Sequence, residues 1–488
     1  MPDRSPQPSL IFFPSALRPL PDEQEEHAAP AVVKEPWGWL EVFTLAQVFW
    51  GVLLFLPGSQ AYRSYIRGFP YVMSLLALIA CVRSNGTDIS VPSARWLLAA
   101  FMLMILNLMR PETWFASGIG QVVFQVSIAA PLFWAARMEM NEARLQRLLF
   151  LIFAANFCSA ALGLLQVFYP ATFLPPEFSS LSAKMNPDFL QGLTYIGAQG
   201  RSIVRPPGLS DLPGSAAIAG ATAVFLAFGF AVRPNLKTVT RVVYIACTFF
   251  AFTVIYLTQV RSLLLMAIGA MLAMAFLRLR QGRLTQSGWM TGIIGALVVA
   301  AFTWAVSVGG QSVHDRFFGI AETGVMETFQ TNRGLFLEYT LRDLLWEHPL
   351  GAGLGRWGMM TVYFGEPNNW QYPSLHAELQ ITGWLFDGGV PLMICYGAAI
   401  ATALRHSYRL AVHTEGTLSD CSMMVFAFQL FVAGLCFTGP VFNTQFGMIF
   451  WLVTAILHGA MRTMQESAMH ELDDHELLEN EAGNGIPA

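Results

Sequence analysis

The chain has 488 residues, of which 54% are apolar and 12% are charged, and its mean hydropathy is +0.49. Soluble domains carry about 25% charged residues, so this composition excludes an ordinary soluble protein. The formal net charge of −4 says little about partners, because acidic residues gather in the two terminal tails, and nucleic acid is not an expected partner.

Both ends of the chain are predicted to be polar tails. Residues 1–36 are rich in proline and mixed in charge, which predicts a disordered cytoplasmic tail with no cleavable signal peptide. Residues 461–488 are predicted to form an acidic cytoplasmic tail. The fold is therefore expected between these two segments.

Apolar stretches recur along the rest of the chain, and a transmembrane helix needs about 20 mostly apolar residues. The sequence predicts an all-α polytopic membrane protein with about twelve transmembrane helices. Spans 1–5 lie within 37–168, spans 6–9 within 213–307 and spans 10–12 within 383–460. The predicted spans are 37–57, 69–83, 96–109, 117–136, 147–168, 213–232, 241–258, 262–277, 288–307, 383–404, 421–438 and 441–460.

The seventh and eighth spans form one apolar stretch that is interrupted only between Thr258 and Ser262. This stretch is about twice the length needed to cross a bilayer. An arginine at the bilayer centre costs about 2.5–3.5 kcal/mol, so Arg261 is unfavourable in the middle of one long helix. Two helices joined by a tight turn at Arg261 are predicted instead.

The distribution of lysine and arginine predicts the orientation. Most basic residues of the short connections fall on one side when both termini are placed in the cytoplasm, which agrees with the positive-inside rule. Two long loops, 169–212 and 308–382, then face the periplasm of a bacterial inner membrane. Long loops in a compact chain are usually functional, so a site is expected on this face.

The positive-inside rule disfavours arginine in these loops, so each arginine there needs an explanation. A basic cavity for phosphate or diphosphate is one, because guanidinium groups pair bidentately with phosphate oxygens. Interfacial snorkelling and loop ion pairs are the other, and this second explanation is favoured for Arg63, Arg67 and Arg110. The remaining candidates are Arg201, Arg205, Arg261, Arg316, Arg333, Arg342 and Arg356.

His376 precedes a predicted span on the same face and is a candidate general base, because imidazole changes its charge near neutral pH. Trp357, Trp370 and Tyr372 lie in the second long loop, where aromatic rings either stack on sugars or form an interfacial belt. The carboxylates on this face have no Asp-x-Asp spacing. The sequence therefore gives no support to a metal-dependent sugar transferase, and neither a metal nor a cofactor is expected.

The order of these motifs resembles the O-antigen ligase/polymerase superfamily. Arg333 is followed by an amphipathic stretch into the glycine-rich segment 348–355, and His376 then opens a helix. Segment 205–214 looks like the arginine-bearing turn that enters a helix in this family, and segment 258–262 looks like its arginine-bearing helix start. The resemblance covers roughly 150–405, and its motifs are specific only as an ordered set.

This resemblance implies a bacterial inner-membrane glycosyltransferase with a GT-C-like helical fold. It implies an undecaprenyl-diphosphate-linked glycan as donor, a glycan acceptor on lipid, contact with membrane lipids and a chain-length regulator protein as a possible partner. The site residues that it implies are His376 as base, Arg333 and Arg261 as catalytic cations that contact the diphosphate, and Arg205 and Arg342 as further diphosphate contacts. Arg201, which lies in the same segment as Arg205, is also predicted to contact the diphosphate.

Two departures from the ligase pattern favour the polymerase branch. Ala377 stands where ligases commonly have Asn, Ser or Gln, and Gly388 and Gly389 lie slightly outside the ligase spacing. The predicted reaction is metal-independent polymerisation of repeat units with inversion at the anomeric carbon. Transfer of the glycan to a lipid A core or to protein is the alternative. A transporter is disfavoured, because the arginines gather at one face.

Overall fold

The computed structural model describes residues 37–85, 90–176, 178, 193–234, 236–366 and 368–483. The predicted 1–36 tail, together with residues 177 and 179–192 of the first predicted long loop, lies outside these residues. Over the described ranges the protein is helical, apart from one two-stranded hairpin. The length and hydropathy of its helices make it a multi-pass membrane protein.

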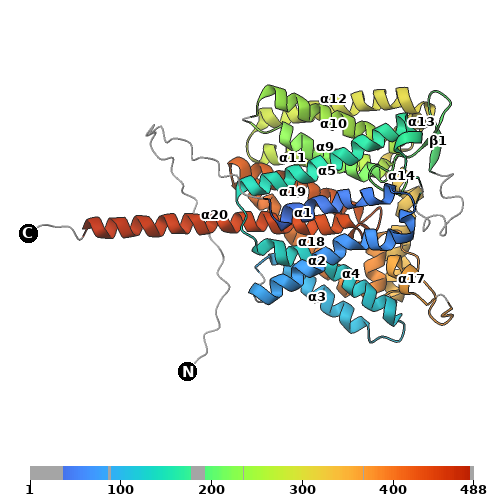
Figure 1. Ribbon diagram of the computed structural model, residues 1–488, viewed down its shortest axis with the longest axis horizontal. Helices are drawn as coiled ribbons and strands as arrows, with labels where there is room; N and C mark the ends of the chain where they lie inside the picture. Colours follow the sequence, from blue (N-terminus) through green and yellow to red (C-terminus); the bar gives the residue numbers. More distant parts are fainter. Residues whose placement is uncertain are drawn as a thin grey trace, which may run out of the picture. The chain divides into compact units, whose positions relative to one another are not determined.

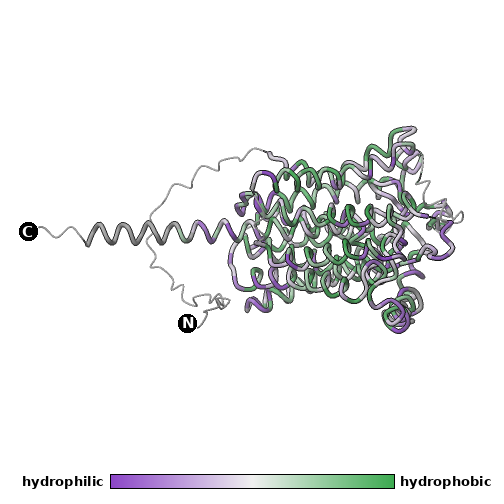
Figure 2. The backbone as a smooth tube through the Cα atoms, turned by 90° about the horizontal axis from the view of Figure 1, so that it is seen from below, coloured by the Kyte–Doolittle hydropathy of each residue, from purple (hydrophilic) through white to green (hydrophobic). Residues whose placement is uncertain are grey.

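The helices run roughly parallel in a bundle (Figure 1), and a helix overlaps each of the twelve predicted spans. Figure 2 shows hydrophobic residues along the helices and hydrophilic residues toward the two ends of the bundle. The helices of the bundle are α1 (Trp39–Phe49), α2 (Arg63–Asn85), α3 (Pro92–Asn107), α4 (Phe115–Trp134), α5 (Glu142–Phe168), α9 (Ala216–Ala231), α10 (Thr238–Thr258), α11 (Arg261–Arg280), α12 (Leu284–Gly309), α18 (Gln380–His413), α19 (Gly416–Leu435) and α20 (Gln445–Gly483).

The prediction of twelve spans is corrected to nine candidate spans in the described residues. The other three are shorter apolar helices, over Trp39–Phe55, Pro92–Asn107 and Ala216–Ala231, and the first of them joins α1 to the 3₁₀ turn η1 (Trp50–Phe55). A helix rises about 1.5 Å per residue, so 16 residues cover about 24 Å of a hydrocarbon core that is about 30 Å thick. Hydropathy located these helices, but their lengths do not by themselves make them spans.

The turn predicted at Arg261 is confirmed, because α10 ends at Thr258 and α11 begins at Arg261. The turn is built around Gln259, the one non-glycine residue with positive φ (59°) in the described part of the chain. Its backbone N–H donates to the carbonyl of Tyr256 at 3.0 Å. Left-handed backbone is unfavourable for a residue with a Cβ, so this conformation persists only because its surroundings impose it.

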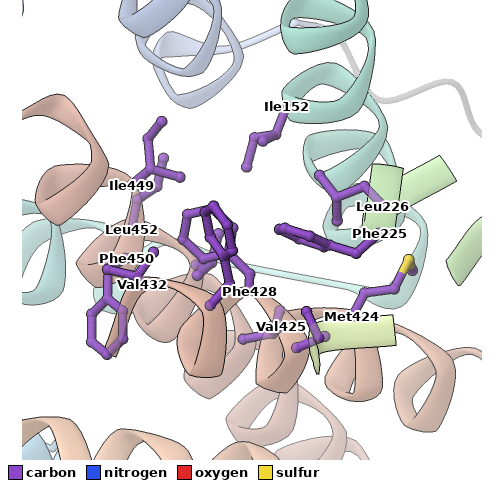
Figure 3. Close-up of a cluster of buried hydrophobic side chains, with 14 of the residues drawn as sticks. Ile152, Phe225, Leu226, Met424, Val425, Phe428, Val432, Ile449, Phe450 and Leu452 are labelled. Atoms are coloured by element: carbon purple, nitrogen blue, oxygen red, sulfur yellow. The ribbon is translucent and has the colours of Figure 1, made fainter. Parts of the chain in front are cut away.

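Helix α9 forms the centre of the bundle and contacts α5, α10, α11 and α19. All of its residues except Ile218 are buried, as expected for a helix that is apolar on every side. Phe225 of α9 lies 5.3 Å from the Phe431 ring and 6.0 Å from the Phe428 ring of α19. Figure 3 shows this cluster, with Met424 and Val425 of α19 beside Phe225. Packing of aromatic rings and small residues therefore holds the core together.

One end of the bundle, here called the loop end, carries the segments between the spans that were predicted as long loops (Figure 1). Strands β1 (Thr194–Ile196) and β2 (Ser202–Val204) pair antiparallel there. The second long loop is mostly helical rather than irregular. Its elements are α13 (Gln311–Thr323), α14 (Val325–Phe329), the π-helical turns η4 (Gln330–Gly334) and η5 (Thr340–Leu344), α15 (Leu335–Tyr339), α16 (Leu345–Glu347) and α17 (Gly358–Phe364).

The smaller elements are the 3₁₀ turns η2 (Ser59–Tyr62), η3 (Ala135–Arg137) and η6 (Val441–Asn443), and the short helix α6 (Pro170–Phe173). At the opposite end of the bundle, α20 continues well past its predicted span. The predicted tail at 461–488 is thus helical through Gly483. Arg278 of α11 and Arg233 both pair with Asp420 of α19 and connect the helices at this end.

Helix α18 is broken near the loop end, where Gly389 has φ 68° and ψ −158°. The glycine-rich segment 348–355 packs against this break. Val390 donates its backbone N–H to the carbonyl of Pro349, and Ala352 donates to that of Phe386, both at 2.9 Å. A Cβ at Gly389 would lie 2.2 Å from the Pro349 carbonyl oxygen, so only glycine allows this approach.

Candidate functional site

Three segments that are distant in sequence are connected by hydrogen bonds at the loop end. The Tyr195 hydroxyl of β1 donates to the Leu257 carbonyl of α10 at 2.8 Å. The Ala198 backbone N–H, in the hairpin turn, donates to the Val308 carbonyl of α12 at 3.1 Å. The hairpin, the α10–α11 turn and the start of α13 therefore form one frame, which the buried Gln259 completes by donating from Nε2 to Ser312 Oγ at 3.0 Å.

Each segment of this frame contributes one arginine: Arg205, Arg261 and Arg316. We call this set the three-arginine cluster. Arg205 follows β2, and its backbone is held on both sides, because its N–H donates to Leu193 at 2.9 Å and its carbonyl accepts from Gly214 at 3.0 Å. Arg316, on α13, acts electrostatically on both of the other guanidinium groups.

The charges of the three-arginine cluster have no counter-ion in the part of the chain that the structure describes. The Nε atoms of Arg205 and Arg261 are buried and make no hydrogen bond. Burial, followed by the charge of Arg316, lowers the pKa of Arg205. Three cations on segments that are hydrogen-bonded to one another, two of them partly desolvated, favour the binding of an anion.

The backbone adds to this preference for an anion. Arg261 is the first residue of α11, and Val260 at its N-cap provides no side-chain hydrogen bond. The first N–H groups of such a helix lack intrahelical acceptors, and the helix dipole favours negative charge there. The three-arginine cluster thus combines guanidinium donors with backbone N–H donors.

A second group consists of two predicted site residues, Arg333 and His376, and of Glu378, which was not predicted as a site residue. One carboxylate oxygen of Glu378 pairs with Arg333, and its other oxygen lies 3.4 Å from Nε2 of His376. Arg333 lies in the π-helical turn η4, a distortion that occurs frequently at functional sites. Burial lowers the pKa of Arg333, while the His376 side chain is 74% exposed and can be reached by a ligand.

No local sequence signal identified Glu378 as the link between Arg333 and His376. Its position two residues after His376 is visible in the sequence, but its pairing with a residue of η4 depends on how the second long loop folds. Figure 1 places β1, α13 and α14 at the same end of the bundle, so both groups belong to the loop end.

Arg201 and Arg342, predicted as diphosphate contacts, are not brought into either group. Arg201 is exposed in the turn between β1 and β2. Arg342 is 77% exposed, and its nearest carboxylate is that of Glu338, at 4.0 Å on the same helical surface. Their side chains face solvent, where a charge–charge interaction contributes little.

The three aromatic residues predicted to stack on sugars have different environments. Trp357 is 2% exposed and packs against Gly383, where an added Cβ would lie 2.1 Å from its ring, so the indole is a core residue and is not available to a ligand. Tyr372 is half-buried, and the Arg356 guanidinium lies 5.6 Å from its ring centroid. Trp370 is 92% exposed and is accessible to a sugar.

The remaining loop arginines have structural partners. Arg110 donates from Nη1 to the carbonyls of Leu350 and Gly351 at 2.6 and 2.9 Å. Arg356 is buried and donates to the Pro373 carbonyl from Nε and Nη2 at 3.0 and 2.8 Å. These guanidinium groups hold backbone segments together, as Arg63 and Arg67 do through Asp211.

The described residues contain no group of three or more His, Cys, Asp or Glu side chains that could hold a metal ion. No protein-family model matches this chain, and no curated protein matches it.

Proposed function

We propose that this chain is an integral-membrane glycosyltransferase that takes a glycan from an undecaprenyl-diphosphate carrier and joins repeat units into a polysaccharide. The observation that carries the proposal is the three-arginine cluster, whose charges no carboxylate of the described chain neutralises. A lipid-linked diphosphate supplies the missing anion at a depth that a membrane-embedded bundle can reach.

The chemistry of the transfer suits this arrangement. A diphosphate leaving group gains negative charge as its bond to the anomeric carbon breaks. Cations that are already in place stabilise that charge and need little reorganisation during the reaction. The three-arginine cluster performs this role in the proposal, so the step does not require a metal ion.

His376 acts as the base in the proposed reaction. Its exposed imidazole removes the proton from the acceptor hydroxyl while the hydroxyl oxygen attacks the anomeric carbon from the face opposite the diphosphate. Attack from that face inverts the configuration. Arg333 adds a further cation on the same side of the protein.

The proposed topology follows from charge and hydropathy. Placing the loop end in the periplasm puts most basic residues of the short connections in the cytoplasm, in agreement with the positive-inside rule. The nine longer helices are the candidate spans, and the shorter helices α1, α3 and α9 lie beside them in the bundle. Local thinning of the bilayer or burial within the bundle accommodates such short helices.

The glycans of a deletion strain test the proposal. A strain without this chain is expected to retain a single repeat unit on its lipid carrier, and the wild-type gene restores long polymer. The His376→Ala variant, present in the membrane at wild-type level, is expected to leave the single repeat unit unpolymerised. Long polymer that remains on the carrier would instead identify transfer to lipid A core or protein, and an unchanged glycan profile would refute the proposal.

A further inference from the structure

The two oxygens of the Glu378 carboxylate are divided between two predicted functional groups. One pairs with Arg333, and the other lies 3.4 Å from His376 Nε2. The carboxylate is 26% exposed, whereas His376 is 74% exposed, so Glu378 is the more buried of the two, and its carboxylate contacts both the imidazole and the arginine. Glu378 is the charged group that the described residues place against His376, and Arg333 is the partner of Glu378.

The backbone holds this arrangement in place. Leu375, just before His376, donates its N–H to the Arg356 carbonyl at 2.7 Å. Gln380, which begins α18, donates its N–H to the Cys436 carbonyl at 3.1 Å, and Leu379 is fully buried. The short non-helical segment between these anchors therefore presents His376 and Glu378 from a fixed backbone.

We propose that Glu378 is a positioning residue that exchanges partners during the reaction: diphosphate takes Arg333 from it, and the freed carboxylate then orients His376 as the base. This inference rests on the proposed function. A diphosphate carries more charge than one carboxylate and accepts bidentate hydrogen bonds from a guanidinium group, so it competes effectively for Arg333. Binding of the donor substrate thus activates His376 as the base of the transfer reaction.

The freed carboxylate has a defined role in the proton transfer. By accepting a hydrogen bond from Nε2–H, it holds the imidazole in the tautomer whose Nδ1 lone pair faces the acceptor hydroxyl. The hydroxyl proton moves to Nδ1 as the new C–O bond forms, and the electron pair of the breaking C–O bond leaves on the diphosphate. Glu378 stabilises the imidazolium until its proton passes to water. A contact of 3.4 Å without ligand is compatible with this role, because catalytic hydrogen bonds often tighten only in the complex.

The test uses the full chain reconstituted in lipid vesicles, with lipid-linked oligosaccharide extracted from the deletion strain as donor. The Glu378→Gln variant is expected to lower kcat about 10- to 100-fold, as for the loss of groups that orient a catalytic residue. Its donor KM should not rise, because the neutral amide competes less well with the diphosphate for Arg333. The acid limb of its pH–rate profile is expected to move to lower pH, because a neutral amide no longer favours the imidazolium. Glu378→Asp keeps the charge and should keep the wild-type midpoint of that limb.

The matched control is Glu366→Gln, which removes an exposed carboxylate of the same loop that accepts a hydrogen bond from Asn369 at 3.0 Å. This variant should retain the wild-type kcat and pH profile. A Glu378→Gln variant with a wild-type pH midpoint overturns the inference, whether or not its kcat or melting temperature falls. If Glu378→Gln does not fold, the comparison passes to Glu378→Asp, and a shifted midpoint in that variant contradicts the inference. Absence of transfer by the wild type refutes the proposed function itself, so the two failures are distinguishable.

Discussion

Two arginine-rich regions at the loop end use the same residue type in opposite ways. Arg63 and Arg67, at the start of α2, pair with Asp211, whose side chain is fully buried. Arg63 Nε lies 2.6 Å from Asp211 Oδ2, and Arg67 also donates to Ser210 at 3.0 Å. The three-arginine cluster has no such carboxylate among the described residues. A buried carboxylate neutralises the arginines of the first region, and under the proposed function an anionic ligand neutralises those of the second.

The pKa values of the two regions express the same contrast. Burial pushes the pKa of Asp211 up, but the charges of Arg67 and Arg63 outweigh this effect and leave the pKa below its usual range. Burial and the charge of Arg316 together lower the pKa of Arg205. The electrostatic energy of the first region is therefore favourable without a ligand, and that of the second becomes favourable when an anion binds.

The largest expected effect is loss of stability in Asp211→Asn. This change leaves the buried Arg63 and its neighbour Arg67 without an anion, and breaking a buried ion pair costs about 3–5 kcal/mol. The melting temperature of the purified protein in detergent should fall clearly. A variant that melts like the wild type would show that this region does not hold the fold.

The same carboxylate gives a pH dependence with a defined sign. Because the folded-state pKa of Asp211 is lowered, its contribution to stability is complete above the unfolded carboxyl value of about 4 and is lost as pH falls through the folded value. The stability difference between wild type and Asp211→Asn should thus shrink below about pH 4. A difference that grows on acidification contradicts this sign.

Arg261→Ala should have the next largest effect, on catalysis rather than stability. Removing one preorganised group that stabilises transition-state charge typically lowers kcat about 10²- to 10³-fold. Polymerisation in vesicles and binding of undecaprenyl diphosphate should both weaken, while the melting temperature stays close to that of the wild type. Arg280→Ala, at the other end of α11, is the matched control and should remain active. Equal losses of activity in the two variants would show that Arg261 has no role in catalysis that Arg280 lacks.

A carboxylate introduced beside the three-arginine cluster should pair with one of its arginines and weaken the binding of an anionic ligand. Ser312 lies one helical turn before Arg316 on α13, so Ser312→Asp places a carboxylate within reach of that guanidinium. We expect undecaprenyl diphosphate to bind about tenfold more weakly, which corresponds to about 1.4 kcal/mol, with no loss of melting temperature. Ser312→Asn introduces a side chain of the same shape as aspartate but without its charge. This variant should bind undecaprenyl diphosphate as the wild type does. Equal affinity in the two variants would argue that no anion binds there.

The smallest effects are expected for Arg201→Ala and Arg342→Ala, because both side chains are exposed. Exposed charges contribute little to binding or stability, so we expect changes in kcat within about twofold. A larger loss in either variant, measured in the same vesicle assay, would extend the anion site beyond the three-arginine cluster.

The sequence by itself determined the membrane class, the positions of helices at all twelve predicted ranges, and the break before Arg261. These features depend on hydropathy and on single charges within short windows, so neighbouring residues are sufficient to predict them. The sequence also selected Arg205, Arg261, Arg333 and His376 as candidates, because their residue types and positions on the predicted periplasmic face suit an anionic substrate. The predicted number of spans was too high, since hydropathy does not fix where a short helix begins and ends.

Only the tertiary structure decided which arginines are paired. Asp211 meets Arg63, and Glu378 meets Arg333, across long separations in sequence. The same is true of Trp357, whose aromatic type suits either a sugar platform or a core and which Gly383 admits into the core. A side chain's charge or ring is a local property, but its partner is set by the packing of distant helices, and that partner decides whether the residue holds the fold or remains available to a ligand.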